Sequence, residues 1–193
     1  MAPIKLIRPK RFSDDRGWFS ETYNSDKYAA IGVDSQFRQD NHSLSRSRLV
    51  LRGLHFQTPP RGQAKLVRCV RGRIWDVAVD IRDGSPTYGR WVAAELSPEN
   101  GHQLYLPVGF AHGFLTLEPD TEVEYKVTDF YAPECDGGLI WNDPALGIAW
   151  PLDGGQPVLS EKDARLLTLA EFRSPFPYDG DPLTSLDPEP LTP

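Results

Sequence analysis

Cysteine, positive charge and long apolar runs are all scarce in this chain of 193 residues, and each scarcity excludes a class of protein. The two cysteines, Cys69 and Cys135, lie far apart and form no CxxC pair, so neither a zinc ribbon nor a disulfide-rich scaffold is indicated. No apolar run reaches the roughly 18 residues of a membrane span. Residues 1–12 lack the continuous apolar stretch of a secretory signal. We therefore expect free thiols, no membrane partner and a cytoplasmic location.

Basic residues are fewer than acidic residues. Lysine and arginine together number 21 against 27 aspartates and glutamates, which gives a formal net charge of −6. An acidic chain is a poor general binder of nucleic acid, so we expect no such partner, and any anionic ligand must be held by a local cluster of Arg or Lys. The composition, 39% hydrophobic and 25% charged residues, is typical of a soluble globular protein.

Short β-type runs separated by Gly and Pro occupy residues 65–128. Residues 65–70 and 73–81 flank Arg71-Gly72, which predicts a tight hairpin. In the second run an apolar face alternates with a face that carries Asp76 and Asp80, the period of a strand. Further strands are expected at 89–96, 102–106, 111–117 and 121–129. Strands at this spacing predict an antiparallel sandwich or barrel.

Helices are expected in only two places. Residues 26–31 end at Gly32, and a second helix is predicted from Ser160, where Ser-Glu-Lys-Asp fits a capping box. Beyond residue 173 the composition changes, with 6 Pro, 4 acids and no Lys or Arg in the last 20 residues. We expect one domain over residues 1–173, followed at 174–193 by a proline-rich acidic tail that lies on the surface or is loose.

The densest polar segment spans residues 38–65 and contains the first candidate site residues. Arg52 and His55 are three positions apart beside Gly53, and Lys65 opens a predicted strand from which it can pair with Asp76 across the hairpin. A guanidinium, an imidazole and an ammonium at the mouth of a barrel would suit an anionic ligand that bears a carbonyl. Taken singly, each of these residues also fits a structural role.

Two further candidates follow along the chain. His112 has apolar neighbours and a flanking glycine, so we expect it to face inward, either as a core histidine or as a functional one. The aromatic residues Tyr125, Phe130 and Tyr131 fit core packing, but a buried tyrosine hydroxyl can also donate a proton. Small β-barrels often bind metal through a His-x-His pair, and here Gln57 follows His55, so no metal is expected.

Several linked motifs follow one another between about residue 4 and residue 172. They are DDRGWFSE at 14–21, RQDNHS at 38–43, LRGLHFQ at 51–57, QAK at 63–65, residues 76–91 and 107–114, YKVTDFY at 125–131 and WNDP at 141–144. In this order and at this spacing they resemble the dTDP-4-dehydrorhamnose 3,5-epimerase family.

This resemblance implies an all-β, cupin-type jelly-roll barrel with a few short helices, and a homodimer without metal or organic cofactor. The substrate it implies is dTDP-4-dehydro-6-deoxy-D-glucose, which is inverted at carbons 3 and 5 to give dTDP-4-dehydro-L-rhamnose. Both carbons flank the ketone at carbon 4, so an enolate forms when either loses its proton.

The resemblance also implies catalytic roles. His55 matches the base, and Asp163 matches the carboxylate that fixes its tautomer. Lys65 matches the ammonium that faces the oxygen at carbon 4, and Asp76 is expected to orient Lys65. Tyr125 matches the acid that returns a proton to the opposite face of the sugar. Inversion requires that the new proton arrive on the face opposite to the one from which the first proton left.

Nucleotide and sugar contacts are implied at nine positions in total. Arg16 and Arg52 suit the diphosphate, Tyr131 matches the residue that stacks on thymine, and His112 matches a sugar contact. The remaining matched positions are Glu21, Gln39, Asn41, Asp136 and Lys162.

Three other functions remain open from the sequence. A mono-epimerase that inverts only carbon 3 or carbon 5 would keep the same catalytic residues. A non-catalytic sugar-nucleotide-binding cupin would keep Arg52 and Tyr131 but would not need an acid and a base on opposite faces. A metal-dependent cupin oxygenase is opposed by Gln57.

Overall fold

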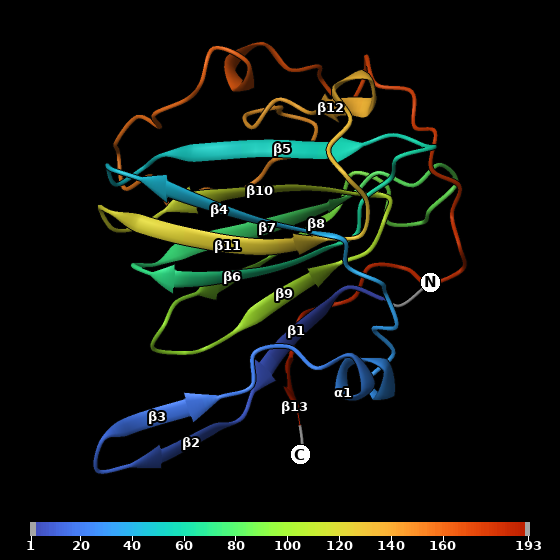
Figure 1. Ribbon diagram of the computed structural model, residues 1–193. Helices are drawn as coiled ribbons and strands as arrows, with labels where there is room; N and C mark the ends of the chain where they lie inside the picture. Colours follow the sequence, from blue (N-terminus) through green and yellow to red (C-terminus); the bar gives the residue numbers. More distant parts are fainter. Residues whose placement is uncertain (1–2, 192–193) are drawn as a thin grey trace.

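The computed structural model describes residues 3–191, and its regular structure is almost entirely β (Figure 1). The larger sheet comprises, in spatial order, β13 (Pro188–Leu191), β1 (Lys5–Pro9), β9 (Gln103–Leu106), β6 (Lys65–Arg71), β11 (Thr121–Val127) and β4 (Gln39–Ser45). The smaller sheet comprises β12 (Asp136–Gly138), β5 (Leu51–Gln57), β10 (Phe110–Thr116), β7 (Ile74–Asp80) and β8 (Trp91–Leu96). Within residues 3–191 no helix is long and apolar enough to cross a membrane.

The chain changes sheet at almost every step along the barrel. β4, β6, β9 and β11 belong to the larger sheet, whereas β5, β7, β8, β10 and β12 belong to the smaller one. Apolar residues that alternate along these strands meet between the two sheets, with Val67 and Leu104 from one wall and Ile74 and Phe114 from the other. Two facing sheets linked in this way form a jelly roll, which confirms the expected all-β, cupin-type barrel.

The prediction of a hairpin at Arg71-Gly72 is wrong. β6 pairs with β9 and β11, and β7 pairs with β8 and β10, so the turn between β6 and β7 carries the chain from one sheet to the other. Gly72 has a φ of +73°, and a Cβ there would lie 2.3 Å from Thr121 Oγ1. A Gly turn between two strands occurs in both arrangements, so the turn residues did not reveal which sheet each strand joins. Lys65 and Asp76 therefore lie on opposite walls.

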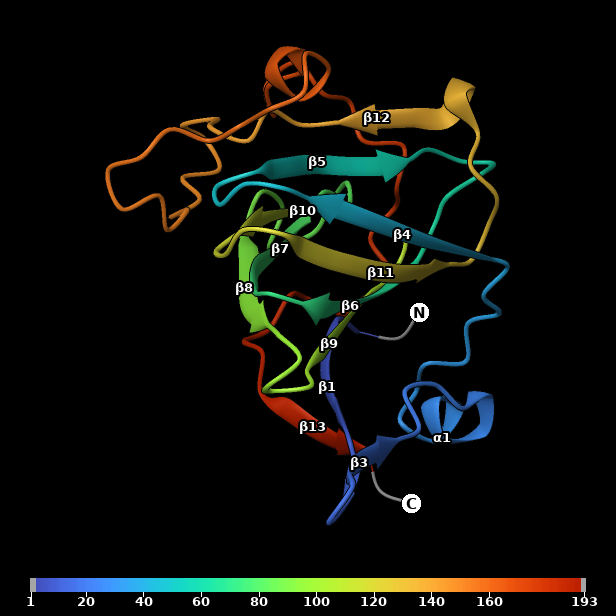
Figure 2. The same cartoon turned by 60° about the vertical axis from the view of Figure 1, so that its left-hand side comes forward.

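Both faces of β7 are buried, although one carries acids. Val77, Val79 and Ile81 pack under residues 139–176, which loop over the outer side of the smaller sheet (Figure 2). Asp76 and Asp80 on the alternate face are completely shielded from solvent. Charges are tolerated there only with partners, and each of the two acids has one.

The two expected helices have different outcomes. Helix α1 (Ser25–Ala30) forms within one residue of the predicted position, and Asn24 caps it by accepting from the amides of Asp26 and Lys27. The second helix, expected from Ser160, is wrong, because only a 3₁₀ turn forms at Asp163–Arg165. The Ser160 hydroxyl does accept from the Asp163 amide at 3.0 Å. The turn stops because Leu167 then bridges to Leu139 in an extended conformation.

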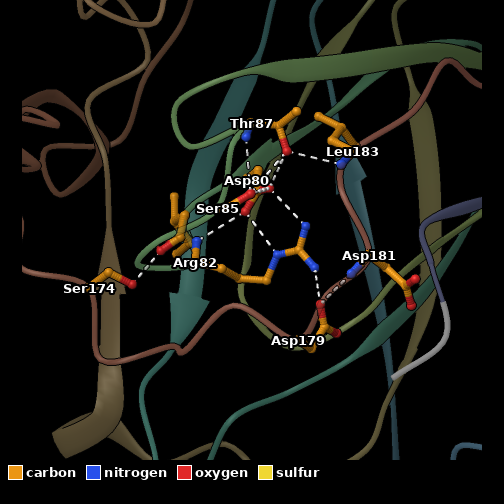
Figure 3. Close-up of polar contacts among 9 residues, drawn as sticks. Asp80, Arg82, Ser85, Thr87, Ser174, Asp179, Asp181 and Leu183 are labelled. Atoms are coloured by element: carbon orange, nitrogen blue, oxygen red, sulfur yellow. Dashed lines mark hydrogen bonds and ion pairs between the residues drawn. The ribbon is translucent and has the colours of Figure 1, made fainter.

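Residues 174–191 lie along the barrel, and a buried cluster of ion pairs joins them to the residues that follow β7 (Figure 3). The Arg82 guanidinium donates to both oxygens of Asp80, at 2.9 and 2.8 Å, and to Asp179 Oδ1 at 2.6 Å. Farther along, the Leu183 amide donates to Thr87 Oγ1 at 3.0 Å. The last strand, β13, then pairs parallel to β1. The tail thus contacts the barrel at several points.

We predict that Arg82→Ala strongly destabilises the protein, because it leaves the buried carboxylate of Asp80 without its counter-charge. Loss of one partner from a buried pair costs roughly 3–5 kcal/mol, which a urea titration of the free energy of unfolding measures. Arg46→Ala is the matched control, because it breaks the exposed pair with Asp120, and exposed pairs contribute about 0–1 kcal/mol. Equal losses in the two variants would contradict the assignment.

Candidate active site

A cavity of about 380 Å³ opens between the two sheets, and its lining comes from both walls. The larger sheet contributes Gln39 and Asn41 on β4, Lys65 on β6 and Tyr125 on β11. The smaller sheet contributes Arg52 and His55 on β5 and His112 on β10. Asp136, at the start of β12 in the smaller sheet, also lines the cavity, and the segments outside the two sheets contribute Tyr131, Lys162 and Asp163. All but three of the residues expected from the sequence therefore meet in this one cavity.

His55 and Asp163 are in direct contact inside the cavity. His55 Nε2 lies 2.6 Å from Asp163 Oδ1, and the Ser160 hydroxyl donates to Asp163 Oδ2 at 2.8 Å. Burial acts to raise the pKa of Asp163, but the contacts with His55 and Ser160 outweigh it and hold this pKa below its usual value. A carboxylate this close to Nε2 favours the tautomer that carries the ring proton on Nε2. His55 Nδ1 has no hydrogen-bond partner within residues 3–191.

Lys65 places an ammonium inside the cavity. Its Nζ donates to the main-chain carbonyl of His55 at 3.3 Å. Burial lowers the pKa of Lys65 to about 8, while the negative charges of Asp76 and Asp136 act in the opposite direction. A desolvated cation of this kind is suited to stabilise negative charge that develops on a ligand oxygen.

Asp76 is bound to a histidine rather than to Lys65. Asp76 Oδ1 lies 2.7 Å from His112 Nε2, and both side chains are buried. Burial is the main cause of the lowered pKa of His112, so the imidazole is neutral at neutral pH. Asp76 acts on Lys65 through its charge, from the opposite sheet.

Tyr125 lies on the opposite wall from His55. Burial raises the pKa of the Tyr125 phenol, although the positive charge of Arg52 acts to lower it, so the hydroxyl keeps its proton at neutral pH. Arg52 donates to Ser45 Oγ at 3.2 Å and to the carbonyl of Leu44 at 3.3 Å, which holds its guanidinium against β4. A proton acceptor and a proton donor thus approach the cavity from different sheets.

Polar contacts between side chains border the mouth of the cavity. The Tyr131 hydroxyl donates to Asp136 Oδ2 at 3.1 Å, and Lys162 forms an ion pair with the same oxygen. On the β4 side the Gln39 amide donates to Asn41 Oδ1 at 2.9 Å. Tyr131 remains 58% exposed, so its ring is available to a ligand at the mouth.

Arg16 and Glu21 lie outside the cavity of their own chain. Arg16 is in the turn between β2 (Arg11–Asp14) and β3 (Gly17–Ser20), a hairpin that projects from the barrel in Figure 1. Its side chain is 91% exposed, and within residues 3–191 it forms an ion pair with Asp14 at the end of β2. Glu21 pairs with Lys27 at 2.8 Å.

The cavity also contains residues that the sequence analysis missed as site residues. Ser43, Gln57, Phe114 and Ser160 all line it. Side chains two positions apart on a strand point to the same face. That rule would have identified three of the four, because Ser43, Gln57 and Phe114 lie two positions after predicted site residues on the same strands. Ser160 was assigned only as a helix cap. Within residues 3–191 no group of three or more His, Cys, Asp or Glu side chains is placed to hold a metal ion.

Fold and cavity together define a class of protein. It is a cupin-type barrel in which a histidine–aspartate pair, a tyrosine hydroxyl and a buried ammonium surround one cavity. Such a set performs proton transfer at carbon atoms beside a carbonyl.

Comparison with known proteins gives the family. A profile of the dTDP-4-dehydrorhamnose 3,5-epimerase family matches residues 1–171. The dTDP-4-dehydrorhamnose 3,5-epimerase of Sinorhizobium fredii is 54% identical over 178 residues, which cover 92% of this chain and 91% of the relative. This chain therefore belongs to the dTDP-4-dehydrorhamnose 3,5-epimerase family, which confirms the resemblance seen in the sequence.

Solved structures agree with this assignment. The dTDP-6-deoxy-D-glucose-3,5-epimerase of Legionella pneumophila, in complex with dTDP-4-keto-L-rhamnose, has a TM-score of 0.84 at 46% identity and covers 88% of this chain and 89% of that one. A 3'-monoepimerase of Streptomyces bikiniensis, in complex with dTDP-quinovose, has a TM-score of 0.81 at 39% identity and covers 88% of both chains.

The electrostatics of the cavity predict one lysine with unusual titration. In an NMR pH titration that observes the Cε carbons of the lysines, Lys65 should have a midpoint at about pH 8, well below the ~10.4 of exposed lysines. Asp76→Asn should move the Lys65 midpoint to lower pH, because a negative charge that favours the ammonium is lost. A Lys65 midpoint that is unchanged in Asp76→Asn would contradict this electrostatic coupling.

Proposed function

We propose that this protein inverts dTDP-4-dehydro-6-deoxy-D-glucose at carbons 3 and 5 to give dTDP-4-dehydro-L-rhamnose. The observation that carries the proposal is the position of His55 and Tyr125 on opposite walls of one cavity that also contains Lys65. Inversion requires that a proton leave one face of the sugar ring and that another arrive on the opposite face. A base and an acid on the same wall could not do this for a ring lying between the sheets.

The chemistry follows from the properties of these groups. His55 Nδ1 takes the proton from a carbon beside the ketone, while Asp163 holds the imidazole and stabilises the imidazolium. The electron pair of the broken C–H bond moves into the ring, and the enolate oxygen at carbon 4 is stabilised by the Lys65 ammonium. The Tyr125 hydroxyl then donates its proton to the other face, and exchange with solvent restores both groups.

Substrate binding is assigned to the cavity mouth. Arg52 and Lys162 supply positive charge for the diphosphate, and the exposed ring of Tyr131 stacks on thymine. Gln39 and Asn41 supply amide groups for the nucleotide, and the neutral His112 faces the sugar. Asp136 holds both Tyr131 and Lys162 before the ligand arrives.

Inversion at both carbons is favoured over inversion at one. Relatives about 50% identical to this chain are named 3,5-epimerases, whereas the 3'-monoepimerase is 39% identical. A non-catalytic binding protein would have no use for the paired His55 and Asp163 inside the cavity.

Two variants test the assignment of base and acid. His55→Asn should lose both deuterium exchange from solvent and epimerisation, because no enolate forms. Tyr125→Phe keeps the base and the ammonium, so it should exchange deuterium into unconverted substrate faster than it makes inverted product. General acid–base groups contribute roughly 10²–10⁴-fold, so mass spectrometry and NMR of the recovered sugar will resolve the difference.

The control is the affinity of each variant for dTDP, which should match that of the unmodified protein. Equal loss of exchange and inversion in Tyr125→Phe, with dTDP affinity intact, would show that Tyr125 is not the acid.

We further infer a cytoplasmic homodimer in which the β2–β3 hairpin of one chain completes the cavity of the other. Arg16 is matched by the family resemblance to a nucleotide contact, yet it lies outside the cavity of its own chain. On the same hairpin Trp18 is 56% and Phe19 is 70% exposed. Exposed aromatic side chains on a projecting hairpin are typical of a surface that a partner covers. A second copy of the chain supplies both the cover and the missing cavity residues.

Mixing two inactive variants tests this assembly. Arg16→Ala and His55→Asn should each be impaired alone, whereas refolding them together should restore activity, because mixed dimers contain one intact cavity. Either a monomer at micromolar concentration with full activity, or no recovery on mixing, would contradict the inference.

A further inference from the structure

Three glutamine side chains hold a segment at the mouth of the cavity through its main chain. Gln57, Gln63 and Gln39 contact the backbone of residues 129–132, which carry the exposed rings of Phe130 and Tyr131. Phe130 is 53% exposed and Tyr131 is 58% exposed. Side-chain amides that bind a main chain fix its position independently of the side chains that it displays.

The three glutamines form hydrogen bonds with main-chain groups of four consecutive residues, 129 to 132. The Gln63 amide donates to the carbonyl of Asp129 at 2.7 Å, and the Tyr131 amide donates to Gln39 Oε1 at 3.1 Å. Gln57 contributes at two positions, because its Nε2 donates to the carbonyl of Phe130 at 3.2 Å and its Oε1 accepts from the Ala132 amide at 2.8 Å. The segment is thus ordered before any ligand binds.

Gln57 has the central position among the three. It is buried on β5, two residues after His55, and its side chain faces the same cavity. Its second amide proton goes to the carbonyl of Arg61 at 2.7 Å, so both of the donors that a glutamine possesses are in use. No donor of Gln57 remains for substrate, so we expect its main effect on a ligand to pass through the segment that it holds.

We propose that Gln57 is a positioning residue that fixes Tyr131 as a preformed stacking surface for the nucleobase. The inference rests on the proposed function, in which Tyr131 stacks on thymine. A surface ordered in advance binds more tightly, because the ligand does not bear the entropy cost of ordering it. Gln57 therefore affects the part of the ligand affinity that comes from the nucleobase. The diphosphate is held by Arg52 and Lys162, with which the Gln57 side chain forms no hydrogen bond within residues 3–191.

The experiment compares two ligands that differ in the base. The dissociation constants of dTDP and of inorganic pyrophosphate are measured by calorimetry for the unmodified protein and for Gln57→Ala. Gln57→Ala should weaken dTDP binding by roughly 5- to 100-fold, the range found when a stacking aromatic is removed. Pyrophosphate binding should be unchanged, because the diphosphate is assigned to Arg52 and Lys162.

Further variants separate positioning from general damage to the fold. Gln57→Glu keeps the size and the acceptor for the Ala132 amide but loses both donors, so it should behave like Gln57→Ala. Thr58→Val is the matched control, because it removes a hydrogen bond from the next residue to the carbonyl of Cys135, outside the segment. It should leave dTDP affinity unchanged. Tyr131→Ala should lower dTDP affinity, and adding Gln57→Ala to it should have little further effect.

Each outcome decides the question. Unchanged dTDP affinity in Gln57→Ala or Gln57→Glu, or equal loss of dTDP and pyrophosphate binding, would overturn the role of Gln57. Additive effects of Gln57→Ala and Tyr131→Ala would overturn it as well. If the unmodified protein binds dTDP more tightly than pyrophosphate but exchanges no deuterium, the proposed catalysis fails while the role of Gln57 stands.

Discussion

The active site depends on one constraint, which is that each ionisable side chain buried in the barrel needs a charged or hydrogen-bonding partner. A carboxylate or an ammonium removed from water is tolerated only against a partner. Asp163 lies against His55 and Asp76 against His112, while Lys65 retains a pKa of about 8 with the help of two carboxylates. The same contacts fix the tautomers and protonation states that proton transfer requires. Stability of the interior and readiness for catalysis thus come from one set of contacts.

The jelly-roll topology determines where these groups act. Successive strands change sheet, so residues close in sequence lie on different walls of the cavity, as His55 on β5 and Lys65 on β6 do. Residues distant in sequence are brought together, as His55 and Asp163 are. A ring that lies between the sheets is exposed to the base on one face and to Tyr125 on the other.

Much of the barrel could be predicted from alternating strands and turn residues, and α1 from the glycine that ends it. The sheet to which each strand belongs could not, because Arg71-Gly72 fits a hairpin as well as a turn between sheets. Most site residues were identified through family motifs. The partner of Asp76, the isolation of Arg16 and the glutamine contacts to residues 129–132 depend on long-range packing, which local sequence does not encode.

Incubation of the unmodified protein with dTDP-4-dehydro-6-deoxy-D-glucose in deuterated water tests the central claim most directly. Label and configuration at each carbon of the product are read by NMR. The account predicts deuterium at carbon 3 and at carbon 5, with both centres inverted. Deuterium and inversion at only one of the two carbons, or no deuterium at either, would contradict it.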